Sequence, residues 1–159
     1  VPTTFLYTCF YWENFIYFGA GPQKGPDGKL YLTMPMGDKR LPGIASEDIG
    51  KVAYGIFKKG SELIGKSVYI AGEHLTGAQL AASLSKAMGK EVLYNDVDPD
   101  VYRTFDFPGA DEMGNMFQFK RDFEEYYCGV RDLDYARKLN PELQRFDQWL
   151  ENNAAKIPV

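Results

Sequence analysis

The chain has 159 residues, 45% of them hydrophobic and 25% charged, which is ordinary for a globular protein and enough for one domain with a sizeable core. Its net charge of −4, with Lys and Arg scattered among acids, argues against direct binding of nucleic acid or of an anionic membrane. No segment approaches the ~20 apolar residues that cross a bilayer. The two cysteines, Cys9 and Cys128, have no CxxC spacing, so we expect reduced thiols in a cytoplasmic protein.

The first sixty residues predict strands and one clear helix. The continuous apolar run "VPTTFLYTCF" (1–10) predicts a strand buried on both faces of a parallel sheet. The turn-rich segment 19–30 predicts a loop or hairpin tip, and "YLTMPM" (31–36) predicts a short strand. Residues 45–60 predict a helix capped by Ser46, with acids in its first turn and lysines in its last. The predicted apolar face of this helix comprises Ile49, Val52, Ala53, Ile56 and Phe57.

The rest of the chain alternates strands and helices and then becomes helical. A capping box of Thr76 and Gln79 begins one helix and Gly89 ends it, while Asp98 caps another that has Pro99 in its first turn. Strand–helix alternation followed by helices indicates an α/β fold. The predicted strands span 66–72 and 91–97, and the predicted helices span 76–90, 98–105, 109–127, 133–140 and 147–154.

The usual catalytic arrangements are missing from the sequence. The single histidine, His74, excludes a histidine-based metal cluster, and no glycine-rich phosphate loop is present. The alternating acids Asp96, Asp98 and Asp100 lack the glycine and distal glutamate of a calcium loop, so capping explains them better. Aromatic residues on the long helix at 109–127 could line a pocket, but such a stripe is usually core: Phe117, Phe119, Phe123, Tyr126 and Tyr127. We therefore predict neither a catalytic residue nor a metal ligand.

The segment "FYWENF" (10–15) is the best candidate site. Its polar pair, Glu13 and Asn14, follows a predicted parallel strand, and open α/β sheets bind their ligands at the carboxyl ends of strands. The Asn14 side chain can donate and accept hydrogen bonds together, as recognition of a carboxamide requires. From the residues alone, an asparagine that caps the next helix beside a solvent-facing glutamate is an equal alternative.

The chain resembles the second half of NmrA-like proteins, atypical members of the short-chain dehydrogenase superfamily, and most of all an animal subgroup of that family. The resemblance begins with "VPTTFLYTCFYWENF" (1–15) and extends over essentially the whole chain. It continues in order through "PQKGPDGK" (22–29), "SEDIGKV" (46–52), "FPGA" (107–110), "NMFQF" (115–119), "LNP" (139–141) and "DQWLE" (147–151).

The resemblance implies a Rossmann-like NAD(P)-binding fold whose glycine-rich, coenzyme-binding half is absent from this sequence. Residues 1–60 would be the last strands and helix of that sheet, and residues 61–159 a smaller, mainly helical α/β lobe. The expected whole is a protein of roughly 300 residues, in which NADP binds only when the N-terminal half is present. Without that half, the first strand should have an open apolar edge, which self-association as a homodimer or another partner would cover.

The resemblance also implies a function. NmrA-like proteins act as sensors of the NADPH/NADP balance that regulate protein partners, argininosuccinate synthetase among them, in the cytoplasm and also the nucleus. The family's nicotinamide-side stretch falls here on Tyr11, Trp12, Glu13 and Asn14, so these residues are the predicted coenzyme-binding site. Two alternatives remain open: an NAD(P)H-dependent reductase of the quinone or isoflavone-reductase type, and a coenzyme-free protein-interaction module.

Overall fold

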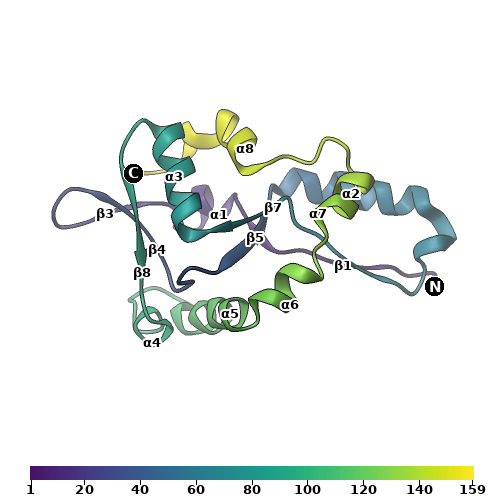
Figure 1. Ribbon diagram of the computed structural model, residues 1–159, viewed down its shortest axis with the longest axis horizontal. Helices are drawn as coiled ribbons and strands as arrows, with labels where there is room; N and C mark the ends of the chain where they lie inside the picture. Colours follow the sequence, from purple (N-terminus) through teal and green to yellow (C-terminus); the bar gives the residue numbers. More distant parts are fainter.

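Eight short strands form three small sheets in a computed structural model that describes all residues, 1–159 (Figure 1). One sheet pairs β1 with β6 in parallel, the second has the order β2-β5-β7, and the third has the order β3-β4-β8. In the second and third sheets, β2 with β5 and β4 with β8 are parallel pairs, whereas β5 with β7 and β3 with β4 are antiparallel. The strands are β1 (Phe5–Tyr7), β2 (Phe10–Tyr11), β3 (Gln23–Lys24), β4 (Leu30–Met34), β5 (Arg40–Ile44), β6 (Ser67–Tyr69), β7 (Glu73–Thr76) and β8 (Val92–Asp96).

The predicted N-terminal strand is two strands in different sheets. Residues Phe5–Tyr7 pair with β6, and Phe10–Tyr11 pair with β5. The prediction of burial on both faces was wrong for β1, because Phe5 is 51% exposed and Tyr7 is 44% exposed. The strand β6 is the only strand of this chain that pairs with β1.

Helices cover the sheets on both sides (Figure 1), and none of them combines the length and the apolarity needed to span a bilayer. The predicted capping box of Thr76 and Gln79 and the Asp98 cap are both confirmed. The helices are α1 (Asn14–Tyr17), α2 (Ser46–Lys59), α3 (Gly77–Met88), α4 (Pro99–Tyr102), α5 (Ala110–Asp122), α6 (Glu124–Gly129), α7 (Leu133–Leu139) and α8 (Phe146–Asn153), with 3-10 turns η1 (Gly60–Leu63) and η2 (Ala154–Lys156).

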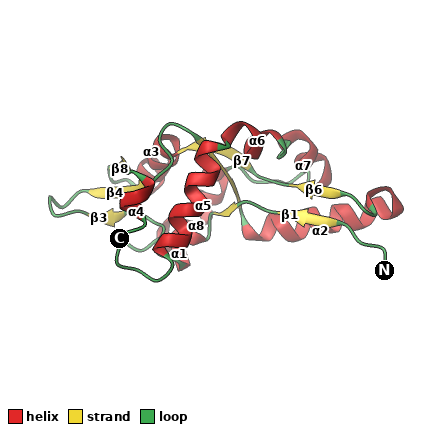
Figure 2. Cartoon of the chain, turned by 90° about the horizontal axis from the view of Figure 1, so that it is seen from below, coloured by secondary structure: helices red, strands yellow, loops and turns green.

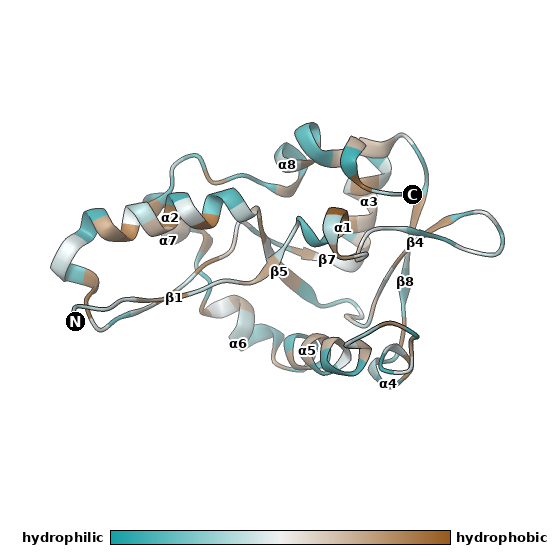
Figure 3. Cartoon of the chain, turned by 180° about the vertical axis from the view of Figure 1, so that it is seen from behind, coloured by the Kyte–Doolittle hydropathy of each residue, from teal (hydrophilic) through white to brown (hydrophobic).

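Two helix predictions need correction. Ser46 does not cap α2: it is the first helical residue, and Ala45 occupies the cap position without a side-chain hydrogen bond. The long helix predicted at 109–127 breaks at Phe123, which separates α5 from α6. Hydrophobic and hydrophilic residues alternate along both α2 and α5 (Figure 3), as expected of helices with one buried face.

Several aromatic residues predicted to be core are at the surface. On α2, Phe57 is 79% exposed. In the stripe along α5 and α6, Phe117 is buried, but the exposed fractions of Phe119, Phe123 and Tyr126 are 47%, 57% and 59%. Phe119 lies two residues after Phe117 in α5, which places it on the other side of that helix, and Phe123 and Tyr126 lie at or beyond the break between α5 and α6.

The core consists of two hydrophobic clusters at the two ends of an elongated molecule (Figure 2). The larger, of 19 buried residues, joins α3, α5 and α8 to β4 and β8. The smaller, of 9 buried residues, joins α2 and α7 to β6. The predicted division between residues 60 and 61 does not coincide with a break in the packing, because β1 and α2 pack with β6 and α7 from beyond that point.

Candidate functional site

The segment "FYWENF" forms the end of β2 and the turn into α1, and its side chains point into different environments. The Trp12 side chain is only 1% exposed and packs against Phe146 and Trp149. Its indole also lies directly on Gly43 of β5, where a Cβ atom would overlap it. Trp12 is therefore a core residue. Its side chain can hold neighbouring residues in place but is too buried to contact a ligand.

Glu13 connects three helices. One carboxylate oxygen, Oε2, accepts hydrogen bonds from the backbone N–H of Ser46 (2.9 Å) and from its hydroxyl (2.7 Å). The other, Oε1, accepts from the indole N–H of Trp149 in α8 (3.1 Å). A carboxylate at the N-terminus of α2 is also favoured by the helix dipole. Glu13 thus takes over the capping role expected of Ser46, and the alternative in which Glu13 simply faces solvent was wrong.

Tyr11 and Asn14 face a cavity of about 370 Å³ between the β2–α1 turn and α5. Tyr11 is 38% exposed, and its hydroxyl pairs with the Thr8 hydroxyl at 2.9 Å. Asn14 is the first residue of α1, where its side chain does not cap the helix and makes no hydrogen bond within the protein. The Asn14 amide is thus free to bind a ligand. We refer to this space as the Lys120 cavity, after the residue described next.

Lys120 is the residue of this cavity that the sequence did not identify. It lies on α5 with Met113 and Met116, at a spacing that places all three on the side that lines the cavity. Lys120 is 6% exposed, and burial lowers its pKa from the ordinary 10.5 to about 8. The only sequence signal is a lysine at a position where the helical repeat predicts an apolar side chain.

A second, larger hollow adjoins the Lys120 cavity. Its volume is about 620 Å³, and it shares Phe18, Ala20 and Met113 with the first. Tyr102 and Phe107 line its far end, so residues of the "FPGA" segment contribute to it. Together the two hollows form a mostly apolar space along α5, of the size and character of small-molecule sites.

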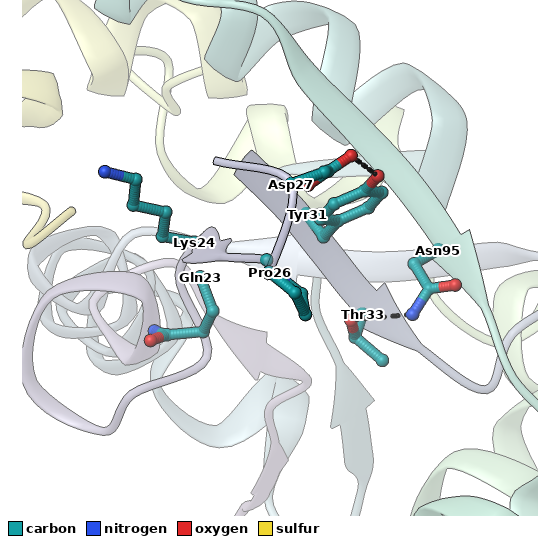
Figure 4. A pocket seen from close by; sticks show the side chains of 8 residues that line it. Gln23, Lys24, Pro26, Asp27, Tyr31, Thr33 and Asn95 are labelled. Carbon is teal, nitrogen blue, oxygen red and sulfur yellow. Dashed lines mark hydrogen bonds between the residues drawn. The ribbon is translucent and has the colours of Figure 1, made fainter. Parts of the chain in front are cut away.

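A third hollow, beneath the β3–β4 hairpin, is more polar and more open (Figure 4). Four of its polar side chains are paired with one another: the Tyr31 hydroxyl donates to Asp27 at 2.8 Å, and the Asn95 amide donates to Thr33 at 3.1 Å. Because these groups are already paired, this hollow is a weaker candidate for a binding site than the Lys120 cavity.

The cysteines, the histidine and the acidic side chains do not form a second candidate site. Burial raises the pKa of the Cys9 thiol to about 12 and that of Cys128 to about 11, so neither is a thiolate near neutral pH. Burial lowers the pKa of His74, whose Nε2 has no hydrogen-bond partner. No three His, Cys, Asp or Glu side chains lie close enough to share a metal ion.

The fold and the sequence identify the family. A model described as "NmrA-like family" matches residues 1–150. The chain belongs to the NmrA-like family. The predicted resemblance is therefore confirmed at the level of the family.

Solved structures of NmrA confirm the α/β, Rossmann-like fold class. NmrA, a negative transcriptional regulator, has been solved with NAD and with NADP, and each complex superimposes with a TM-score of 0.75 at 24% identity. In each case the match covers 98% of this chain and 53% of NmrA.

Reductases share the fold at lower identity. The Citrobacter sp. triphenylmethane reductase complexed with NADP(H) has a TM-score of 0.73 at 17% identity, over 97% of this chain and 53% of the reductase. An NADPH-dependent quinone oxidoreductase from Escherichia coli has a TM-score of 0.67 at 20% identity, over 94% of this chain and 54% of that enzyme. This NmrA-like chain therefore spans about half the length of the solved structures it matches.

Proposed function

We propose that the chain is the nicotinamide-side and partner-binding lobe of an NADP(H)-binding regulatory protein, without catalytic residues of its own. The observation that carries the proposal is the free Asn14 amide, at the carboxyl end of β2 and in the wall of a cavity. Ligands of open α/β sheets bind at this edge. The bound NAD and NADP in the NmrA structures support a nicotinamide coenzyme as the ligand.

Of the four predicted coenzyme-binding residues, only two have side chains in a position to contact a coenzyme. Asn14 has the donor and the acceptor that a nicotinamide carboxamide needs, and the Tyr11 ring borders the same cavity. Trp12 and Glu13 are committed to the core and to Ser46, so we assign them the task of holding the turn in place. Phosphate groups would need a glycine-rich loop, which this sequence lacks. We therefore propose that NADP binds only together with the glycine-rich half implied by the resemblance.

The proposed role is sensing of the NADPH/NADP balance, with protein partners of the argininosuccinate synthetase kind and a homodimer as a further possibility, in the cytoplasm and nucleus. A reductase is the second candidate, because NADP(H)-dependent reductases share this fold. Fold similarity does not separate the two, because activity depends on the site. A coenzyme-free interaction module is the third.

The test is calorimetric titration of NADP⁺ into the protein that includes the glycine-rich half. The Asn14→Ala variant should bind about tenfold more weakly, as loss of one or two hydrogen bonds costs about 1–1.5 kcal/mol. Asn152→Ala, at an exposed position on α8, is the matched control and should bind like the wild type. Unchanged affinity of Asn14→Ala would refute the assignment. Turnover of NADPH with a quinone in the same sample would favour the reductase.

A further inference from the structure

Lys120 is a buried cation without a counter-ion. Its side chain takes part in none of the ion pairs of the structure, and its ammonium donates no hydrogen bond to the protein. Burying an unpaired charge is costly, so such groups are rare unless a partner is supplied. The position of Lys120 in the wall of a cavity, rather than in the closed core, allows a ligand to supply that partner.

The groups around Lys120 compensate its charge only weakly. Its ammonium lies over the rings of Phe117 and Tyr127, at 5.8 and 5.6 Å from the ring centres. Such contacts stabilise an ammonium far less than its removal from water destabilises it. The nearby Cys9 is a neutral thiol at neutral pH.

A second buried cation adds to the positive charge on this side. Arg131 is 5% exposed, stacks over Tyr127 at 3.7 Å and donates to two backbone carbonyl groups, but it has no carboxylate partner. Its Nε is buried and without a hydrogen-bond partner. Burial raises the pKa of Cys9, and the positive charges of Arg131 and Lys120 oppose that rise.

The rest of the cavity is apolar. Phe10, Met113 and Met116 are among the apolar residues of its wall, and Phe18 lines both this cavity and the adjoining hollow. The one other uncommitted polar side chain is the Asn14 amide. A matching ligand has an apolar, flat body for the methionine and aromatic walls and one anionic oxygen group for the ammonium.

We propose that the Lys120 cavity binds a small aromatic carboxylate, with the carboxylate held by the Lys120 ammonium and the ring body lying against Met113 and Met116. The proposal deepens the proposed function, because Asn14 borders the same cavity. It assigns to the site a second, anionic ligand that is not the coenzyme. Lys120 would then be a binding residue whose unfavourable burial is offset when the ligand is present.

The experiment compares two probes of nearly the same shape on the chain of residues 1–159. Calorimetry at pH 7 measures the binding of 1-naphthoate and of 1-naphthamide, which differ in charge but hardly in size. The wild type should bind the carboxylate at least tenfold more tightly, because only the carboxylate can form a hydrogen bond with opposite charges to the buried ammonium. The Lys120→Met variant should lose this preference and still bind the amide.

Two further variants separate a binding role from a general effect. Lys120→Arg keeps the positive charge and should retain most of the preference for the carboxylate. Lys58→Met is the matched control, because Lys58 also lies over an aromatic ring, that of Tyr54 at 4.9 Å, but is exposed on α2. This variant should bind both probes like the wild type.

Equal binding of the two probes, or a preference that survives in Lys120→Met, would overturn the proposal, as would the absence of binding by either probe. None of these measurements requires the coenzyme. A failure here therefore leaves the NADP titration of Asn14→Ala unaffected, and the two proposals can fail separately.

Discussion

The two sides of the β2–α1 turn differ in how their polar groups are satisfied. On one side, Glu13 is bonded to Ser46 and Trp149, and the fully buried Asp48 of α2 is bonded to Asn140 and Gln144. On the other side, the side chains of Asn14 and Lys120 line the cavity and make no hydrogen bond within the protein. The carboxylates buried near this turn are therefore paired where they hold helices together, whereas the buried ammonium of Lys120 has no such partner. Three substitutions test that contrast.

The largest effect is expected for Asp48→Ala. Asp48 is 0% exposed and accepts hydrogen bonds from the Asn140 amide (2.9 Å) and the Gln144 backbone N–H (3.0 Å). Its loss leaves a buried amide donor unpaired and separates α2 from the segment between α7 and α8. We expect the free energy of unfolding in urea to fall by about 4 kcal/mol. A loss below ~1 kcal/mol would mean that this network does not hold the helices together; Lys58→Ala, at an exposed site, serves as control.

A smaller loss is expected for Glu13→Ala. The variant removes three hydrogen bonds and leaves the buried indole N–H of Trp149 without an acceptor. The expected loss in the free energy of unfolding is about 3 kcal/mol, and Glu13→Gln should lose less because it keeps an acceptor. Glu62→Ala, which removes an exposed acid from a surface ion pair with Lys59, should change stability by no more than ~0.5 kcal/mol. If Glu13→Ala behaved like Glu62→Ala, Glu13 would not be structural.

Lys120→Met should raise the free energy of unfolding, whereas the two preceding variants lower it. The fall in the Lys120 pKa from 10.5 to about 8 corresponds to a penalty of about 3 kcal/mol, and lost ring contacts offset part of it. The variant should therefore be more stable than the wild type by about 2 kcal/mol at pH 7, in the absence of ligand. A variant of equal or lower stability would show that Lys120 is adequately compensated.

The same variant has a defined pH dependence. Below about pH 8 the lysine is charged in the folded and the unfolded chain, so the wild type bears the full penalty. Between about pH 8 and 10.5 the folded chain has released this proton and the unfolded chain still holds it, so the wild type gains stability relative to the variant as pH rises. The other groups that face Lys120 are Cys9, Tyr127 and Arg131. Because both proteins contain them, their titration cancels when the free energy of unfolding of the variant is subtracted from that of the wild type at each pH. If the difference in free energy of unfolding between the wild type and Lys120→Met stayed constant between about pH 8 and 10.5, the lowered pKa could not belong to Lys120.

The sequence by itself determined some of the local elements and the family. The Thr76–Gln79 capping box, the Asp98 cap with Pro99 and the turn before β4 were predictable because each depends on hydrogen bonds or backbone preferences within a few residues. The ordered motifs from "FYWENF" to "DQWLE" predicted the NmrA-like family, and the family model confirmed it. The α/β class followed from the order of the elements.

Only the tertiary structure decided which polar groups are used and which are free. The partners of Glu13 lie 33 and 136 residues away along the chain, so no local pattern could assign it to Ser46 and Trp149. The division of the first strand depends on pairing with β5 and β6, which also lie far from it along the chain. Lysines are rarely buried, and Lys120 becomes so only through the packing of α5 in the tertiary structure. Burial and pairing are properties of contacts between distant segments, and these contacts place a free amide and an unpaired ammonium in one cavity.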